Sequence, residues 1–451
     1  MDTTRVLLGC SIVAIASMIL LANSINGKEK ERKMLNTSPV VREQGVEARS
    51  EEWARYYPRQ YETWKQTSES VKIDDKLKKK PQLAVLWAGY GFASDDNAPR
   101  GHVYALQDNI NTLRTGAPVS PTTGPSPTAC WSCKSPDIPR LIGQIGEQEY
   151  FTGKWARFGS EVVNSVGCAD CHDSRTGNLV LSRPWLKKGL ESSGVRLDRI
   201  PHQQMRSLVC AQCHSEYYFQ KGEETGANGG KRVVNTVTFP WANGFKGENI
   251  EEYYDLTGFS DWIHAISKAP MLKAQHPDYE LYTAGIHGRR DVACADCHMP
   301  FMRDGGLKIS DHWIRSPLTN LNNACQTCHN IPEEELYDRV MTIQTNTAGL
   351  LRTTEAAILD AIDAIMAAMD AGATDEQLAE ARQYHRAASL RWDFVSSENS
   401  TGFHSPQEAA RVLANAIDNA RLAQISANEV LNTLQGSTVS DTTTGPQAGG
   451  A

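Results

Sequence analysis

Ten of the eleven cysteines stand in five C-x-x-C pairs, and these pairs constrain the chain more than any other feature. In four of them the second cysteine is followed at once by histidine. These motifs are Cys168-Ala-Asp-Cys171-His172, Cys210-Ala-Gln-Cys213-His214, Cys294-Ala-Asp-Cys297-His298 and Cys325-Gln-Thr-Cys328-His329. C-x-x-C-H attaches c-type haem through two thioethers, and its histidine ligates the iron. Zinc ribbons and thioredoxin-like dithiols do not explain four such histidines. The sequence therefore predicts four histidine-ligated haems.

The fifth pair, Cys130-Trp-Ser-Cys133-Lys134, has lysine where the others have histidine. It is a structural dithiol, a decayed haem site, or a fifth haem with Lys134 as the proximal ligand. The last interpretation is favoured. An ammonium has no lone pair for iron, so the role requires neutral lysine, a form that burial promotes.

The five motifs begin at residues 130, 168, 210, 294 and 325, without the fixed period of a solenoid. Beyond the four proximal histidines, eight remain as possible distal ligands: His102, His202, His264, His276, His287, His312, His385 and His404. An odd ligand in an otherwise uniform array suggests that its distal face is open to substrate. The residues alone thus predict one catalytic haem and four that feed it electrons, for a multi-electron reduction of a small molecule.

The N-terminus predicts export. Arg5 precedes an apolar run over 6–22, which is typical of a secretory signal, and small residues place cleavage after Ser24. An uncleaved membrane anchor is the alternative. Cys10 is interpreted as part of the apolar run rather than as a lipoprotein site. Export suits c-type haem attachment, and the net charge of −7 argues against a nucleic-acid partner.

The remaining chain divides into regions of different amino-acid composition. Residues 25–52 form a polar lead-in, 53–330 the pentahaem catalytic region, 331–435 a helical region and 436–451 a flexible Ser/Thr/Gly-rich tail. Residues 216–219 and 233–239 are expected to pair as a hairpin. The expected fold is mostly α, a multihaem cytochrome c fold with helices and loops around five haems, few short strands and long C-terminal helices.

Three C-terminal helices are predicted. Apolar residues at a spacing of three or four mark the first, which ends at Gly372; they are Ile358, Ile362, Ile365, Met366 and Met369. Thr374 caps the second, which ends near Phe394. Ser405, followed by Pro406 and Glu408, opens the third, which ends near Leu434.

C-W-S-C-K followed by four C-x-x-C-H motifs closely resembles ammonia-forming cytochrome c nitrite reductase, a family of pentahaem periplasmic enzymes. The resemblance covers about residues 53–434. It includes Thr112-Leu113-Arg114-Thr115-Gly116, His214-Ser215-Glu216-Tyr217-Tyr218-Phe219, Lys268-Ala-Pro-Met-Leu-Lys273-Ala-Gln275-His276-Pro277 and Gly402-Phe403-His404. It implies reduction of nitrite to ammonium with six electrons and eight protons.

The resemblance also implies the residues at the catalytic haem. Arg114 would hold nitrite and its developing negative charge, and Tyr217 and His276 would donate protons or hydrogen bonds. A calcium beside that haem would be held by Glu216, Tyr217, Lys273 and Gln275. Calcium takes oxygen ligands, so Tyr217 and Lys273 would contribute backbone carbonyls. From sequence alone, each of these residues also has an ordinary structural explanation.

For the electron-transfer haems, the resemblance implies four distal ligands. His102 would serve the haem of Cys210/Cys213, His312 that of Cys168/Cys171, His404 that of Cys294/Cys297 and His287 that of Cys325/Cys328. His202, His264 and His385 receive no role.

The implied partners are nitrite, a redox donor (a soluble cytochrome or a membrane quinol dehydrogenase) and a second copy of the chain. Small and apolar residues along the last helix would form the dimer contact, or would pack on the chain's own core; they are Ala409, Leu413, Ala416, Ile417, Ala420, Ala427 and Leu431. The competing functions are a pure electron conduit with every haem six-coordinate, and reduction of sulfite or hydroxylamine.

Overall fold

The computed structural model describes residue 11 and residues 14–27, 40–113, 126–225 and 230–442, with side chains placed up to residue 436. Arg114, Cys10 and residues 28–39 of the polar lead-in therefore lie outside the described residues. Residues 14–27 are helical. Nowhere in the described part of the chain is a helix both long and apolar enough to span a membrane.

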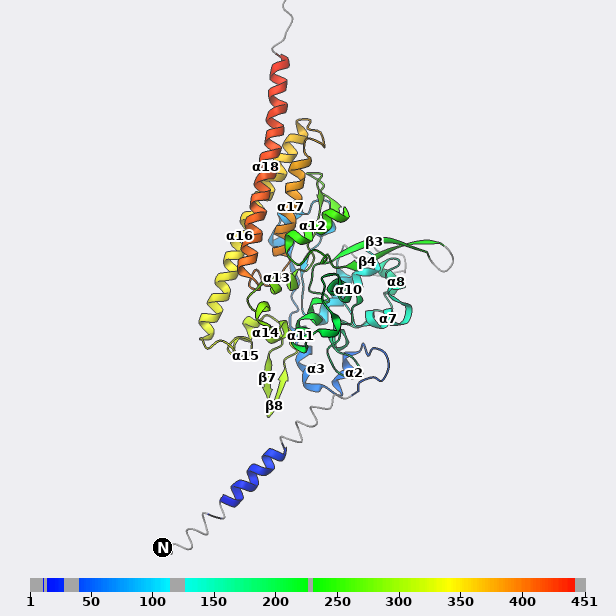
Figure 1. Cartoon of the computed structure of the whole chain (residues 1–451), viewed down its shortest axis with the longest axis vertical. Coiled ribbons are helices and arrows are strands. Elements are labelled where there is room, and N and C mark those ends of the chain that lie inside the picture. Colours follow the sequence, from blue (N-terminus) through cyan, green and yellow to red (C-terminus); the bar gives the residue numbers. More distant parts are fainter. Residues whose placement is uncertain (1–10, 12–13, 28–39, 114–125, 226–229, 443–451) are drawn as a thin grey trace, which may run out of the picture.

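Short helices joined by loops build the haem-binding region (Figure 1). They are α2 (Ser50–Ala54), α3 (Pro58–Lys65), α4 (Lys76–Lys79), α5 (Leu83–Leu86), α6 (Ala105–Asn111), α7 (Asp137–Ile145), α8 (Glu147–Tyr150), α9 (Cys168–Cys171), α10 (Pro184–Ser192), α11 (His202–Ala211), α12 (Gly247–Thr257), α13 (Asp278–Ala284), α14 (Cys294–His298) and α15 (Leu321–Ala324). Few of them are long enough to be stable alone. Their positions depend on the packing described below.

Strands occur only as two-stranded antiparallel pairs in the described chain. The pairs are β1 (Asp74–Asp75) with β2 (Asn97–Ala98), β3 (Tyr218–Thr225) with β4 (Lys231–Thr238), β5 (Trp262–Ile263) with β6 (Pro270–Met271), and β7 (Phe301–Asp304) with β8 (Leu307–Ser310). The predicted hairpin forms as β3 and β4, in register from Tyr218 opposite Thr238, but β3 begins at Tyr218 rather than at residue 216 and extends to Thr225. It projects from the body in Figure 1.

Large aromatic side chains fill the centre of this region. Trp131, Trp155, Trp185 and Trp241 are fully buried and belong to one apolar cluster. Trp131 and Trp155 lie with ring centroids 4.5 Å apart. Each buried aromatic ring removes a large apolar area from water, so this cluster stabilises loops that have little regular structure of their own.

Three long helices form a pillar along one side of the molecule: α16 (Glu333–Asp370), α17 (Ala379–Ser396) and α18 (Pro406–Thr442) (Figure 1). The mostly α prediction is confirmed. Thr374 and Gln377 exchange hydrogen bonds, but they cap a turn, and α17 begins only at Ala379. The tail prediction is wrong over 436–442, where α18 continues. Residues 436–442 contain no proline, the next being Pro446, so no proline interrupts the backbone hydrogen bonds of the helix in this stretch.

The small-residue face of α18 packs inside the chain. Ala409, Leu413, Ala416, Ala420 and Ala427 are fully buried, and all of them except Ala416 belong to apolar clusters shared with residues of α16 and α17. Small side chains let the three helices approach closely. The prediction that this stripe forms the dimer contact is therefore wrong. The homodimer itself stays a prediction.

Candidate active site

Each haem motif makes one tight turn. In three C-x-x-C-H motifs the histidine N–H donates to the carbonyl of the first cysteine at 2.9 Å, as for His172 and Cys168. That turn brings the two thiols and the imidazole to one side of the backbone. In the fifth motif the Lys134 N–H donates instead to Trp131 O, at 2.9 Å. The lysine motif thus has a turn of a different kind.

A buried arginine, which the sequence did not single out, holds the lysine motif. Arg183 donates to Ser132 O and Ser135 O, each at 2.9 Å, on either side of Cys133 and Lys134. Its charge is paired with the buried carboxylate of Asp170, which lies inside the next haem motif. Arg183 therefore fixes two haem motifs relative to each other.

Four pairs of imidazoles face each other at nearly equal spacing. The ring centroids are 6.3 Å apart for His102 and His214, and 6.2 Å apart for three further pairs: His172 with His312, His298 with His404, and His287 with His329. A nitrogen ligand lies about 2.0–2.1 Å from a first-row metal, so two imidazoles on opposite sides of one ion have centroids about 6–6.5 Å apart. The spacing fits one iron between the rings of each pair. These are the four pairs that the resemblance implied.

Burial keeps several of these imidazoles neutral, the form that ligates iron. It lowers the pKa of His102 and of His312 to about 4. It also lowers the pKa of His172 and His298. His404 differs. Its burial is opposed by Glu398, whose carboxylate lies 2.5 Å from Nδ1 and raises the pKa to about 9.

Two of the three residues implied at the catalytic haem lie in the described chain, and Arg114 lies outside it. Burial raises the pKa of Tyr217 well above its ordinary value, and the neighbouring Cys133 and Cys130 add to the effect, so Tyr217 lies beside the lysine motif. His276 Nδ1 is 2.8 Å from Asp278 Oδ2, and its ring centroid is 4.6 Å from that of His214.

Asp278 connects these residues and was also missed from the sequence. Burial alone would raise its pKa, but His276 and His214 reverse the effect and hold the pKa well below its usual value. The carboxylate is therefore ionised beside both imidazoles.

The four residues implied for calcium come together. Glu216 is fully buried, and its Oε2 accepts the Gln275 N–H at 2.6 Å. The Gln275 amide donates to Lys273 O at 3.2 Å, while the Lys273 ammonium points to Asp393, 2.8 Å away. The Lys273 carbonyl, not its side chain, thus lies in this cluster. The Tyr217 carbonyl belongs to the residue directly after Glu216.

The buried carboxyl groups of this cluster suit a bound cation. Burial raises the pKa of Glu216 well above its ordinary value and that of Glu280 to about 8. Within the described residues no ion pair engages Glu216, and Glu280 Oε2 is buried without a hydrogen-bond partner. Carboxylate and carbonyl oxygens are calcium ligands, so the donor set fits that ion.

Helix α17 holds the segment that carries Lys273, Gln275 and His276. Three hydrogen bonds join the helix and the segment in the same order along each. Arg382 donates to Ser267 O (2.8 Å), Arg386 donates to Pro270 O (3.0 Å), and Asp393 accepts the Ala274 N–H (3.0 Å). The helix and the segment therefore run parallel. The spacing of four and seven residues puts these polar side chains on one helix face, a pattern that could have flagged them in the sequence.

The three histidines without a predicted role stay apart from the iron-type pairs. His202 is exposed. His264 and His385 are fully buried, with ring centroids 5.1 Å apart and the Ser267 hydroxyl 3.1 Å and 3.0 Å from their Nδ1 atoms. His264 and His385 strengthen the contact between α17 and the segment that carries Lys273.

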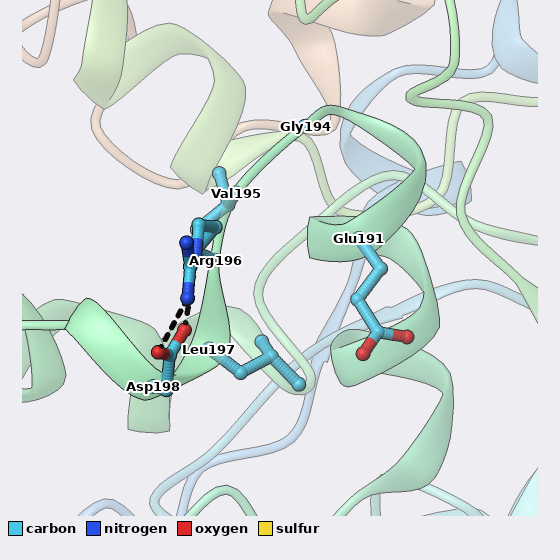
Figure 2. A pocket seen from close by; sticks show the side chains of 6 residues that line it. All are labelled: Glu191, Gly194, Val195, Arg196, Leu197 and Asp198. Atoms are coloured by element: carbon cyan, nitrogen blue, oxygen red, sulfur yellow. Dashed lines mark hydrogen bonds and ion pairs between the residues drawn. The ribbon is translucent and has the colours of Figure 1, made fainter.

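An open pocket of about 450 Å³ lies elsewhere, around the end of α10 (Figure 2). Its lining includes Glu191, Arg196 and Asp198, and the arginine and aspartate pair with each other at 2.7 Å. None of the predicted site residues lines it, so it is not the candidate active site.

Comparison with known proteins gives one family. The cytochrome c552 family model matches residues 49–448. "Cytochrome c-552" of Desulfotalea psychrophila is 52% identical over 434 residues, covering 95% of this chain and 84% of that protein. The protein of the same name from Maridesulfovibrio salexigens is 51% identical, covering 96% and 86%.

A solved structure agrees with this. The catalytic subunit of cytochrome c nitrite reductase from Desulfovibrio desulfuricans ATCC 27774 superposes with a TM-score of 0.76 at 33% identity. The match covers 86% of this chain and 87% of that one, and the structure is described with two calcium sites.

Proposed function

The chain belongs to the cytochrome c552 family, and we propose that it is an ammonia-forming cytochrome c nitrite reductase. One nitrite, six electrons and eight protons give one ammonium and two waters. The main support is the set of four imidazole pairs with ring centroids 6.2–6.3 Å apart, together with a fifth motif that has lysine in place of histidine. Four uniform sites suit electron storage, and the odd one suits chemistry.

The cofactors are covalently bound haem c, five per chain, and calcium. When bound, the haems would supply the electrons, and Lys134 would hold the iron at which nitrite is reduced. Lys134, His172, His214, His298 and His329 would ligate the irons from within their own motifs, and His312, His102, His404 and His287 would supply the second ligands. One calcium is assigned to Glu216, Gln275 and the carbonyls of Tyr217 and Lys273; the buried, cation-free carboxylate supports it.

The protein groups bind the anion and deliver protons. Arg114 holds nitrite by charge, an assignment that rests on its sequence motif. His276 commits Nδ1 to Asp278, which leaves Nε2 for the substrate. The Tyr217 hydroxyl is the second donor. Calcium, bound to the backbone of Tyr217, would fix where that hydroxyl points.

Export and assembly complete the proposal. Residues 1–24 direct the chain to the periplasm, where c-type haem attachment takes place, and a soluble cytochrome or a membrane quinol dehydrogenase supplies electrons. The chain forms a homodimer through the C-terminal helices. Its contact includes the large apolar side chains that these helices expose: Met366 (42% exposed) on α16, and Leu422 (43%) and Ile425 (53%) on α18.

An ammonium assay with reduced viologen and nitrite, run beside an optical spectrum, tests the function. We expect ammonium formation and a high-spin haem signal. A pure electron conduit gives no ammonium and only low-spin haems. Faster turnover of sulfite or hydroxylamine than of nitrite would assign the enzyme to another substrate.

A further inference from the structure

One carboxylate oxygen joins two different haem sites. Asp278 Oδ2 lies 2.8 Å from His214 Nδ1 and 2.8 Å from His276 Nδ1. His214 belongs to the motif of Cys210 and Cys213, whereas His276 is the distal histidine of the lysine motif. Both imidazoles donate their Nδ1 proton to this oxygen, which leaves the Nε2 atom of His214 available to ligate iron and that of His276 available to the substrate.

The partner of His214 is unlike that of most other axial histidines. His172, His298 and His312 have backbone carbonyls 2.8–2.9 Å from Nδ1. A carbonyl orients the ring but carries no net charge. A carboxylate also makes the imidazole a stronger electron donor to its metal. Apart from His214, only His404 among the described axial histidines is paired with a carboxylate, that of Glu398.

Asp278 is itself held firmly. Its Oδ1 accepts the Asn399 N–H at 2.8 Å, and its Oδ2 accepts from the Asn399 side chain at 2.9 Å. The next residue, Tyr279, donates its N–H to His214 O at 3.0 Å. Asp278 is 7% exposed, so water competes little for these contacts. The carboxylate therefore has one position, and both imidazoles take theirs from it.

We infer that Asp278 is a positioning residue shared by the haem site of the lysine motif and the haem site of Cys210 and Cys213. It aims His276 at the substrate and, through His214, stabilises the ferric state of the Cys210/Cys213 haem, which lowers the reduction potential of that haem. This inference rests on the proposed function for the role of His276. The effect on the haem of His214 needs only that histidine's place as an iron ligand.

The test is Asp278→Asn, which keeps the shape of the side chain and removes its charge. We expect five attached haems, a more positive potential and altered low-spin spectrum for one haem, and a loss of nitrite turnover of about 10–100-fold, typical of changing an outer-shell partner. Asp311→Asn is the matched control. Asp311 is a buried carboxylate next to a haem ligand, but it bonds the Trp313 N–H rather than an imidazole. It should leave the His214 haem unchanged.

An unchanged potential and spectrum of that haem in Asp278→Asn would overturn the inference, as would an equal shift of all five haems. If this variant fails to bind five haems, Asn399→Ala decides, because it loosens the carboxylate without removing it. It should give a smaller shift in the same haem, and no shift would overturn the inference. The potential needs no nitrite, so wild-type ammonium formation tests the proposed function separately.

Discussion

Lys134 is the residue that separates this chain from an ordinary cytochrome. Lys134→His converts the fifth motif into C-x-x-C-H and leaves both thiols in place. We expect haem content near five, a changed high-spin signal and a loss of nitrite turnover of tenfold or more, on the order of changes around a metal site. Haem analysis, electron paramagnetic resonance and an ammonium assay measure these effects.

The matched control is Lys154→His, at an exposed lysine of the same region. It should leave all three readouts unchanged. Undiminished ammonium formation by a five-haem Lys134→His variant would remove Lys134 from the catalytic site.

Glu216 tests the calcium assignment. Glu216→Ala removes the charged ligand from a fully buried cluster, so calcium should be lost and Tyr217 should lose its fixed position. Metal analysis should find one calcium fewer per chain, with five haems retained and turnover reduced about tenfold or more. Glu223→Ala, at an exposed position of hairpin strand β3, is the control. Equal calcium content in the Glu216 variant and the wild type would show that the site is wrong.

For single residues, the sequence predicts best those sites whose functional groups lie close together along the chain. Two thiols and a proximal ligand must lie within five residues, so the motifs were visible at once. Arg183 and Asp278 were not, because each acts across the fold: Arg183 bonds Ser132 at a separation of 51 residues, and Asp278 pairs with His214 at a separation of 64. No local pattern records such a contact. The pairing of His102 with His214 likewise needed the family resemblance.

Among the elements, α17 is the one that positions the site. Its Asp393 and the Lys273 ammonium are 2% and 4% exposed and form a buried ion pair. Asp393→Ala leaves that ammonium unpaired and frees the Ala274 N–H. We expect unfolding free energy to fall by about 3–5 kcal/mol, the cost of breaking a buried pair. Denaturant unfolding measures it.

Calcium should also bind more weakly to Asp393→Ala, since the Lys273 carbonyl lies in the calcium cluster. Asp363→Ala, on the exposed side of α16, is the control and should stay within about 0.5 kcal/mol of the wild type. Wild-type stability of the Asp393 variant would refute the role given to α17.

The helices show where periodicity succeeds and where it stops. Periodicity predicted the first C-terminal helix, because apolar spacing follows the helical turn directly, while capping residues marked the starts of the other two. It could not assign a partner to the small-residue face of α18. That face is equally suited to a neighbouring helix and to a second chain, and only tertiary packing shows that α16 and α17 cover it.

For the whole molecule, the exposed apolar side chains of the pillar should carry the dimer. Leu422→Asp combined with Ile425→Asp puts two charges where the proposal has a dry contact. Light scattering should report twice the mass of a haem-loaded chain for the wild type and a single chain for the variant. Leu256→Asp, 75% exposed at the end of α12, should remain dimeric. A wild-type protein with the mass of one chain would refute the homodimer.

The central claim is a six-electron reduction of nitrite at one of five haems. Its most direct test is stoichiometry: reduced viologen consumed, nitrite consumed and ammonium formed by the purified haem-loaded protein. We expect six electrons and one ammonium per nitrite, with no nitric oxide or hydroxylamine accumulating. Two results would contradict nitrite reduction to ammonium. The protein could leave nitrite unconsumed while it still oxidises viologen with another acceptor, or it could take one electron per nitrite and release nitric oxide.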